Sequence, residues 1–178
     1  MNNRYHRSLL LPVGLHNVDL TATSVISNYT LDKEPAFLDF LYSLGLAVYT
    51  TEKFYLAPGT VLPIHTDQDN FNDCVKLNFV YCDGVSTTSW YEPKPNTVPV
   101  VNKTPIGTYY TKPADISDIV KVYEADTVGT SLLNVGHYHG VTNGASPRVT
   151  ISIKLKDTTT NNEIFWDDAL ARLSQYVV

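Results

Sequence analysis

The order of secondary-structure elements is the feature that most limits the fold of this chain. Between residues 46 and 155, short runs that favour strands follow one another without alternating helices. We expect strands at 46–49, 54–56, 61–65, 74–81, 120–125, 131–135, 138–142 and 149–155. Because no helix connects one strand to the next, the sequence predicts an antiparallel barrel or sandwich.

Helical patterns flank this β-rich region. Apolar residues at 36, 37, 40, 41 and 44 repeat at helical spacing, and the segment 162–177 is amphipathic. We expect both helices to pack outside the strands of a single domain over residues 1–178, with residues 1–30 as an extended lead-in that holds one edge strand. The proline-rich segment 91–114 is expected to be a long loop with one hairpin, a type of element that can serve as a substrate lid.

Charge and cysteine content narrow the classes of partner. The net charge is −5 and the sequence has no basic stripe, which disfavours binding to nucleic acid. Cys74 and Cys82 are expected to be free thiols, as is usual in a reducing compartment. Pro12 ends the short apolar run at 9–11, and no segment has the length of a membrane span. We therefore expect a cytoplasmic protein without a membrane partner.

A histidine and an aspartate lie two residues apart in His65-Thr66-Asp67. On a strand, such residues point to the same side and can aim at one point. Together with a second histidine further along the chain, they can bind iron(II) on one face and leave three coordination positions open. His139 is the preferred second histidine, with His137 as the alternative, and Asp69 is the alternative to Asp67. A surface histidine beside a solvated, aspartate-rich loop would explain the first pair alone.

Arg148 opens an apolar, alternating run on the strand that follows the second histidine. Its guanidinium is therefore expected to point partly inward, where a buried arginine needs an anionic partner. A small dicarboxylate would supply that partner through a bidentate contact.

The ordered set His65-x-Asp67, His139-x-Val141-x-Asn143 and Arg148-x-Thr150 resembles the iron(II)- and 2-oxoglutarate-dependent oxygenases. The likeness runs from about residue 55 to 155 and is closest to small prolyl- or aspartyl-hydroxylase-like members, including phage-type ones.

This resemblance implies a double-stranded β-helix, a distorted jelly roll, in a mainly β protein with flanking helices. It implies that His65, Asp67 and His139 bind Fe(II), that Arg148 anchors 2-oxoglutarate, and that Thr150 assists. The implied activity is hydroxylation of a C–H bond on a peptidyl or free amino-acid side chain, with dioxygen consumed and succinate and carbon dioxide released. Ascorbate is a further cofactor used in such systems.

Several other residues are weaker candidates. Asn78 and Tyr55 are candidate cosubstrate contacts, and His137, Trp90 and Tyr91 are candidate substrate contacts. Lys76 shares a strand face with Asn78, where polar groups indicate either a ligand or one solvent-facing side of a sheet.

Two other classes of function remain open. A jelly roll can also be a non-catalytic module that binds a ligand or a protein, or a metal cupin enzyme that does not use 2-oxoglutarate. Nucleobase demethylation is disfavoured, because Lys154 stands where family members that repair nucleobases carry a second arginine.

Overall fold

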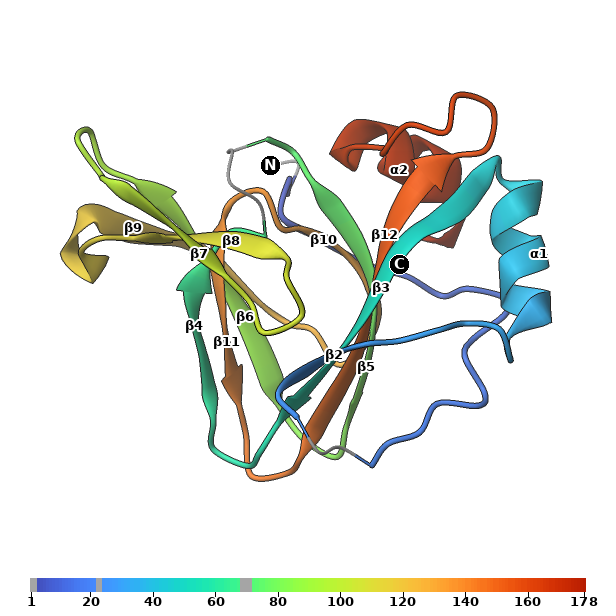
Figure 1. Ribbon diagram of the computed structural model, residues 1–178, viewed down its shortest axis with the longest axis horizontal. Helices are drawn as coiled ribbons and strands as arrows, with labels where there is room; N and C mark the ends of the chain where they lie inside the picture. The colour runs from blue at the N-terminus through green and yellow to red at the C-terminus, as the bar shows by residue number, and fades with distance from the viewer. Residues whose placement is uncertain (1–2, 22–23, 68–71) are drawn as a thin grey trace.

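The computed structural model describes residues 3–21, 24–67 and 72–178, and its main feature is two facing antiparallel sheets (Figure 1). The six-stranded sheet has the order β1-β10-β5-β12-β3-β2 and the four-stranded sheet the order β4-β11-β6-β9. The strands of the first sheet are β1 (His6–Ser8), β2 (Ile26–Asn28), β3 (Leu46–Leu56), β5 (Val75–Cys82), β10 (Gly129–Asn134) and β12 (Arg148–Asp157). Those of the second are β4 (Val61–His65), β6 (Ser86–Pro93), β9 (Ile119–Asp126) and β11 (Tyr138–Asn143).

The chain passes repeatedly between these sheets. From β3 to β12 each strand lies in the opposite sheet to its predecessor, apart from the step between the neighbouring strands β6 and β9. The insertion between β6 and β9 carries a separate hairpin of β7 (Pro99–Lys103) and β8 (Tyr109–Pro113). This topology is a double-stranded β-helix, so the expectation of a mainly β fold with flanking helices is confirmed.

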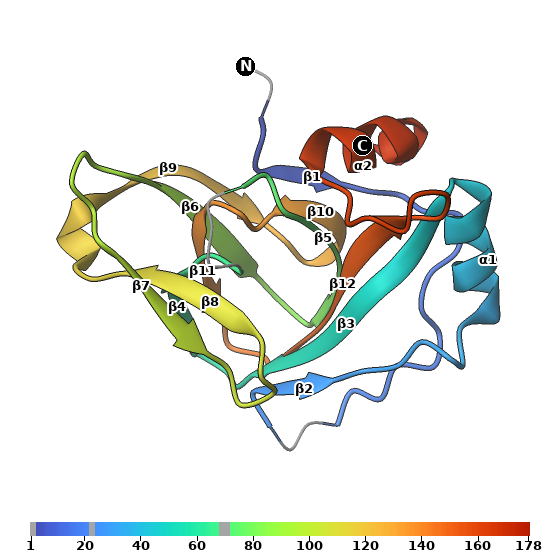
Figure 2. The same cartoon turned by 45° about the horizontal axis from the view of Figure 1, so that its top comes forward.

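The main hydrophobic core lies on the outer face of the six-stranded sheet. Helix α1 (Pro35–Ser43) and helix α2 (Trp166–Leu173) cover this face (Figure 2). They bury Phe37, Leu41, Trp166 and Leu173 against strand residues such as Ile153. Because β5 and β12 point their apolar side chains outward to this core, their alternate positions face the space between the sheets.

Most of those alternate positions are polar. Lys76 and Asn78 of β5 and Arg148, Thr150 and Ser152 of β12 are all buried. The interpretation of Lys76 and Asn78 as one solvent-facing side of a sheet is therefore wrong, because helices cover one face of β5 and the second sheet covers the other.

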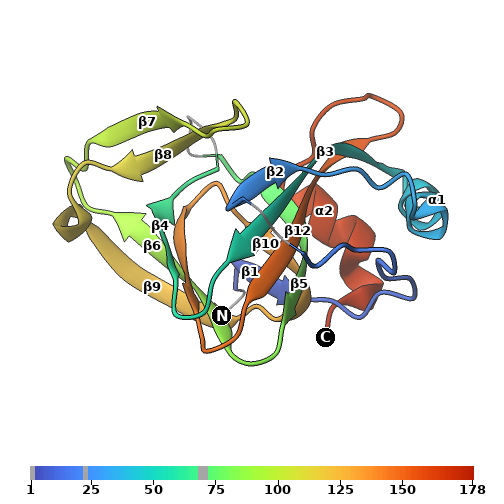
Figure 3. The same ribbon diagram turned by 60° about the horizontal axis from the view of Figure 1, so that its bottom comes forward.

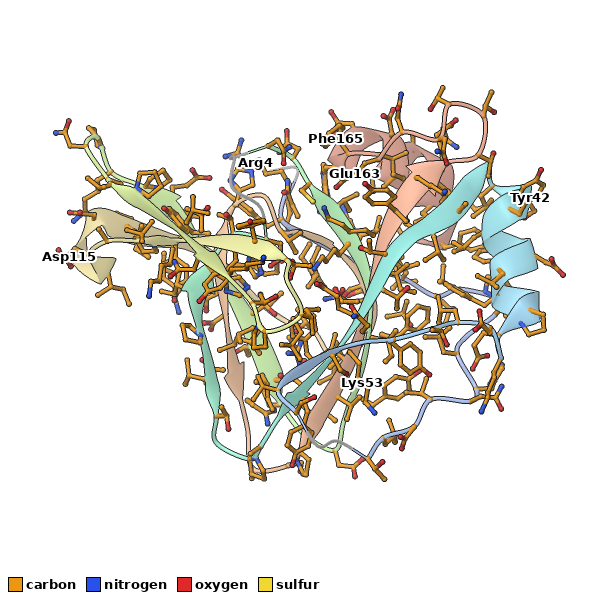
Figure 4. The ribbon with its side chains drawn as sticks, in the orientation of Figure 1. Arg4, Tyr42, Lys53, Asp115, Glu163 and Phe165 are labelled. Atoms are coloured by element: carbon orange, nitrogen blue, oxygen red, sulfur yellow. The ribbon has the colours of Figure 1, made fainter. Side chains whose placement is uncertain are left out.

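The N-terminal lead-in is held along the edge of the six-stranded sheet. Lys53 of β3 donates hydrogen bonds to the carbonyls of Asp19 and Thr21 (Figure 4). Glu34, just before α1, accepts hydrogen bonds from the amides of His16 and Asn17. This segment contributes two short strands, β1 and β2, rather than the single edge strand expected.

Other differences from the expected elements have local causes. The runs at 46–49 and 54–56 form the continuous strand β3, because its polar centre pairs with β12 through the whole length. The C-terminal helix is shorter than the amphipathic segment and ends in a 3-10 turn, Ser174–Tyr176. Among the described residues, no helix is long and apolar enough to cross a membrane.

Candidate metal centre

His65, Asp67 and His139 meet at one end of the space between the sheets. His65 ends β4 and is the direct cross-strand partner of His139 in β11. Asp67 Oδ1 lies 3.1 Å from His65 Nε2 and 3.7 Å from His139 Nε2. One donor atom from each residue lies within 4.8 Å of the other two, which is a spacing that could hold a metal ion.

Backbone carbonyls fix both imidazole rings. His65 Nδ1 lies 2.7 Å from the carbonyl oxygen of Pro63, and His139 Nδ1 lies 2.9 Å from that of His137. A carbonyl oxygen can only accept, so each Nδ1 carries the hydrogen and each Nε2 presents a lone pair toward Asp67. Metal-binding histidines are commonly oriented in this way. The donor set therefore fits a divalent transition metal.

Close backbone packing positions the two halves of this centre. The amide of Asp67 donates to the carbonyl of Val135, 3.0 Å away. A Cβ atom at Gly136 would lie 1.4 Å from the carbonyl oxygen of Asn72, so only glycine permits the approach of these segments. The turn before His139 is thus packed directly on the backbone at residues 72–74, just before β5.

A buried lysine binds the other oxygen of Asp67. Lys76 Nζ lies 2.8 Å from Asp67 Oδ2 and 2.6 Å from Glu52 Oε2. Burial would raise the pKa of Asp67, but the neighbouring Lys76 ammonium holds this pKa well below its usual range. Burial, with the nearby His65, lowers the pKa of His139 to about 4, so this ring is neutral at pH 7.

Arg148 lies at the start of β12 and is only 3% exposed. Its Nε has no hydrogen-bond partner, and within residues 3–21, 24–67 and 72–178 no carboxylate forms an ion pair with it. Burial lowers the pKa of this guanidinium to about 10. Thr150, two residues further on the same face, also has a buried hydroxyl without a partner among the residues that the structure describes. The Arg148 guanidinium and the Thr150 hydroxyl are therefore two hydrogen-bond donors that can bind an anion.

A narrow cavity of about 40 Å³ connects the two sets of residues. It is lined by His65, Asp67 and His139 and also by Arg148 and Thr150. Asn78 and Ser152 also line it, and the Ser152 hydroxyl donates to Asn78 Oδ1 over 2.7 Å. The Asn78 amide nitrogen is therefore free of that contact and can donate to a ligand.

A wider cavity of about 430 Å³ adjoins His65 and Asp67. Aromatic residues from β3 and the β7–β8 hairpin line it, and Tyr110 packs edge-on against the His65 ring with centroids 5.9 Å apart. The hairpin lies on the β4 side of the molecule, away from the helices (Figure 3). The polar residues that line this wider cavity include Glu52, Lys76, Lys112 and Lys154.

The remaining candidates lie elsewhere. Tyr55 lines neither cavity, because its neighbour Phe54 takes the inward position. Trp90 is fully buried in a small core and donates to the carbonyl of Asn134, and Tyr91 is half-buried on the same strand. The His137 ring points toward Asp73 and Glu92, 3.3 Å from each.

Two further points concern the alternatives for the ligand set. His137 lies in the bend before β11 rather than on the strand that carries His139. Asp69 lies outside the described residues. Glu52 and Tyr110 were not expected near the metal motif, and the only sequence signal for either is the inward parity of Glu52 with Phe54 on β3.

Comparisons with known proteins identify no family. No family model matches the chain, and no curated protein matches it. Among solved structures, the nickel complex of the non-heme monooxygenase ThoJ is 16% identical with a TM-score of 0.33, covering 70% of this chain and 53% of its own. L-ribose isomerase from Cellulomonas parahominis with L-psicose is 18% identical with a TM-score of 0.34, covering 83% and 72%. The chain thus spans about half the length of the monooxygenase.

Proposed function

We propose that this protein is an iron(II)- and 2-oxoglutarate-dependent dioxygenase that hydroxylates a C–H bond. One observation carries the proposal: Arg148, a buried cation that has no anionic partner among the described residues, shares a narrow cavity with the His65, Asp67 and His139 donors. A ligand that chelates a metal at one end and carries a carboxylate at the other would satisfy both sets of residues.

The charges of the buried residues support the same ligand. Of the charged residues that line the two cavities, the carboxylates of Glu52 and Asp67 balance the cations of Lys76 and Arg148. The two other lining lysines add no buried charge, because Lys154 pairs with Glu163 and Lys112 is exposed. A divalent metal would add two positive charges to a region from which water is largely excluded, and such charges need compensation. A dicarboxylate such as 2-oxoglutarate restores neutrality.

Within this proposal each residue has a separate role. Arg148 would hold the distal carboxylate of 2-oxoglutarate, Thr150 would donate its hydroxyl to the same group, and the amide of Asn78, which lines the same cavity, would donate to the cosubstrate. His65, Asp67 and His139 hold the iron. When bound, iron(II) supplies the redox chemistry through which dioxygen and 2-oxoglutarate yield succinate, carbon dioxide and a hydroxylated product.

The primary substrate is assigned to the wider cavity. His65 and Asp67 line both cavities, so a group bound in the wider one is adjacent to the proposed metal from a different side than the cosubstrate. Its aromatic lining, from Tyr49, Phe54, Tyr109 and Tyr110, suits an apolar side chain. A peptidyl or free amino-acid side chain is the substrate class that we propose.

The test is the visible spectrum of the protein with iron(II) and 2-oxoglutarate in the absence of oxygen. We expect a weak metal-to-ketoacid charge-transfer band in the wild type and none in Asp67→Ala, which removes a ligand. Iron bound without the band would contradict 2-oxoglutarate use and favour a metal cupin enzyme. Failure to bind iron would contradict the enzyme proposal and favour a jelly-roll binding module.

A further inference from the structure

We infer that Lys76, held in place by Glu52, is a positioning residue that presents a single oxygen of Asp67 to the metal. The inference rests on the proposed metal centre. It adds two residues, on β5 and β3, that lie outside the expected ligand set.

The two oxygens of Asp67 have different partners. Oδ1 lies 3.1 Å from His65 Nε2 and 3.7 Å from His139 Nε2, so it points to the centre of the histidine pair. Oδ2 lies 2.8 Å from Lys76 Nζ. A metal bound between the imidazoles can therefore reach Oδ1, while Oδ2 is already occupied by an ammonium group.

The Lys76 ammonium is itself fixed from several sides. Glu52 Oε2 lies 2.6 Å from Nζ, and the Phe54 ring lies below the ammonium with its centroid 5.7 Å away. Lys76 and Glu52 are 4% and 6% exposed. Lys154, the cross-strand partner of Lys76, pairs with Glu163 at 2.9 Å and so does not compete for Asp67. The lysine thus has little freedom to leave Oδ2.

A role in stability alone does not explain this arrangement. A buried ion pair is often no more stabilising than apolar residues of similar volume, because both charges lose their hydration. One carboxylate would suffice to neutralise Lys76, yet two are present and one of them belongs to the histidine cluster. What the second contact adds is a fixed direction for the Asp67 carboxylate.

That direction determines how many coordination positions stay open. Two histidines and one carboxylate oxygen leave three positions for a chelating cosubstrate and dioxygen. If Asp67 bound through both oxygens, it would occupy one of these three. By holding Oδ2, Lys76 prevents this loss without contacting the metal.

The number of metal-bound waters tests the inference directly. We would load the protein with Mn(II) alone and measure the water-proton relaxation enhancement, which depends on exchangeable waters at the ion. The main variant is the double substitution Glu52→Gln/Lys76→Met, which removes one negative and one positive charge together and leaves no unpaired Glu52. We expect it to lose about one third of the wild-type enhancement, as one of three open positions is filled.

Two single variants act as controls. Lys76→Arg keeps a cation that can bind Oδ2 and should restore most of the enhancement. Glu52→Gln retains Lys76 but removes the carboxylate that holds its ammonium in place. This variant should therefore lose a smaller part of the relaxation enhancement than the double variant. Wild-type enhancement in both the double variant and Glu52→Gln would overturn the inference. If the double variant does not fold, Glu52→Gln alone tests the inference, and wild-type relaxation enhancement in that variant overturns it.

Failure of this inference differs from failure of the proposed function. If the wild type itself binds no Mn(II), the metal centre is wrong and the positioning role fails with it. If the wild type binds Mn(II) and the variants match its relaxation, only the role of Lys76 and Glu52 is wrong.

Discussion

Arg148 is buried, and no carboxylate in the described part of the chain forms an ion pair with it, which is unusual for an arginine in a folded protein. Removing a guanidinium from water costs several kcal/mol unless a hydrogen-bonded partner compensates for it. The lowered pKa of Arg148 reflects this cost, since burial is its largest cause. A residue that is unfavourable in the ligand-free protein and complementary to a carboxylate is expected to trade stability for binding.

Substituting Arg148 by methionine should therefore have opposite effects on folding and on binding. We expect the free energy of unfolding of the ligand-free protein to stay the same or rise by about 1 kcal/mol or more, because the uncompensated charge is removed. Affinity for 2-oxoglutarate should fall by about a hundredfold, as for loss of a buried charged contact. Urea denaturation and titration of the charge-transfer band measure the two quantities.

Arg148→Lys serves as the control that keeps the positive charge but loses the two-pronged guanidinium contact. A marked loss of stability in Arg148→Met would indicate an internal structural role instead.

His139 gives the metal-free protein a defined dependence on pH. Its pKa is lowered from 6.5 to about 4 in the folded state by burial and by His65. Between pH 6.5 and 4 the unfolded chain therefore binds a proton that the folded protein does not, so stability falls as the pH falls. We expect this group to remove about 2 kcal/mol of unfolding free energy between pH 7 and 5.

The measurement is urea denaturation at both pH values in the presence of a chelator. His139→Asn lacks the titrating group and isolates its share, because every other ionisable residue is common to both proteins. An equal loss of stability in the variant and the wild type would show that His139 does not account for the effect.

At the scale of elements, a pair of backbone hydrogen bonds attaches the β7–β8 hairpin to the metal motif. The amide of Thr66, between the ligand candidates His65 and Asp67, donates to the carbonyl of Thr111 over 2.7 Å, and the Thr111 amide donates back over 3.0 Å. The hairpin forms its own two-stranded sheet and lines the wider cavity with Tyr109 and Tyr110. This contact therefore sets how the hairpin lies over the cavity.

Thr111→Pro should detach the hairpin without unfolding the domain. Proline has no amide hydrogen, so the bond to the Thr66 carbonyl is lost. We expect hydrogen exchange across residues 94–114 to accelerate at least tenfold, which corresponds to about 1.4 kcal/mol of local opening free energy. Tyr109→Pro is the matched control, since this residue lies two positions away on β8 and its amide does not pair with Thr66. Equal acceleration in both variants would mean that proline disturbs the hairpin itself.

The elements were predictable from the sequence where alternation or helical spacing was strong, and less so elsewhere. Strands β4, β11 and β12 were expected close to their observed bounds because hydrophobic alternation and turn residues mark them. The pairing of His65 with His139 could not be derived from periodicity, because it depends on which strands become neighbours. Resemblance to a family placed the two histidines in one expected ligand set but did not predict their cross-strand pairing. It predicted nothing about Glu52, whose contact with Lys76 is long-range.

At the scale of the whole molecule, the two faces of the six-stranded sheet have different roles. The outer face of the six-stranded sheet packs on α1 and α2 and forms the main apolar core. The inner face carries Lys76, Asn78, Arg148, Thr150 and Ser152. Because the core that stabilises the domain lies outside the β-helix, the space between the sheets can hold charged groups that would destabilise an ordinary sandwich core.

This division predicts how ligands stabilise the molecule. The buried carboxylates and cations around the cavities are balanced before ligands bind, so a dianion without a metal leaves excess negative charge. We expect 2-oxoglutarate to raise the unfolding temperature little in the presence of a chelator. With saturating Mn(II), 2-oxoglutarate at a hundred times its dissociation constant should add about 2.7 kcal/mol, or roughly 5–10 °C for a domain of this size. Glutarate, which keeps both carboxylates but lacks the keto group, should give a smaller shift because it cannot chelate through the keto acid. Equal stabilisation by 2-oxoglutarate with Mn(II) and with chelator would instead describe an anion-binding jelly roll in which Arg148 acts without a metal.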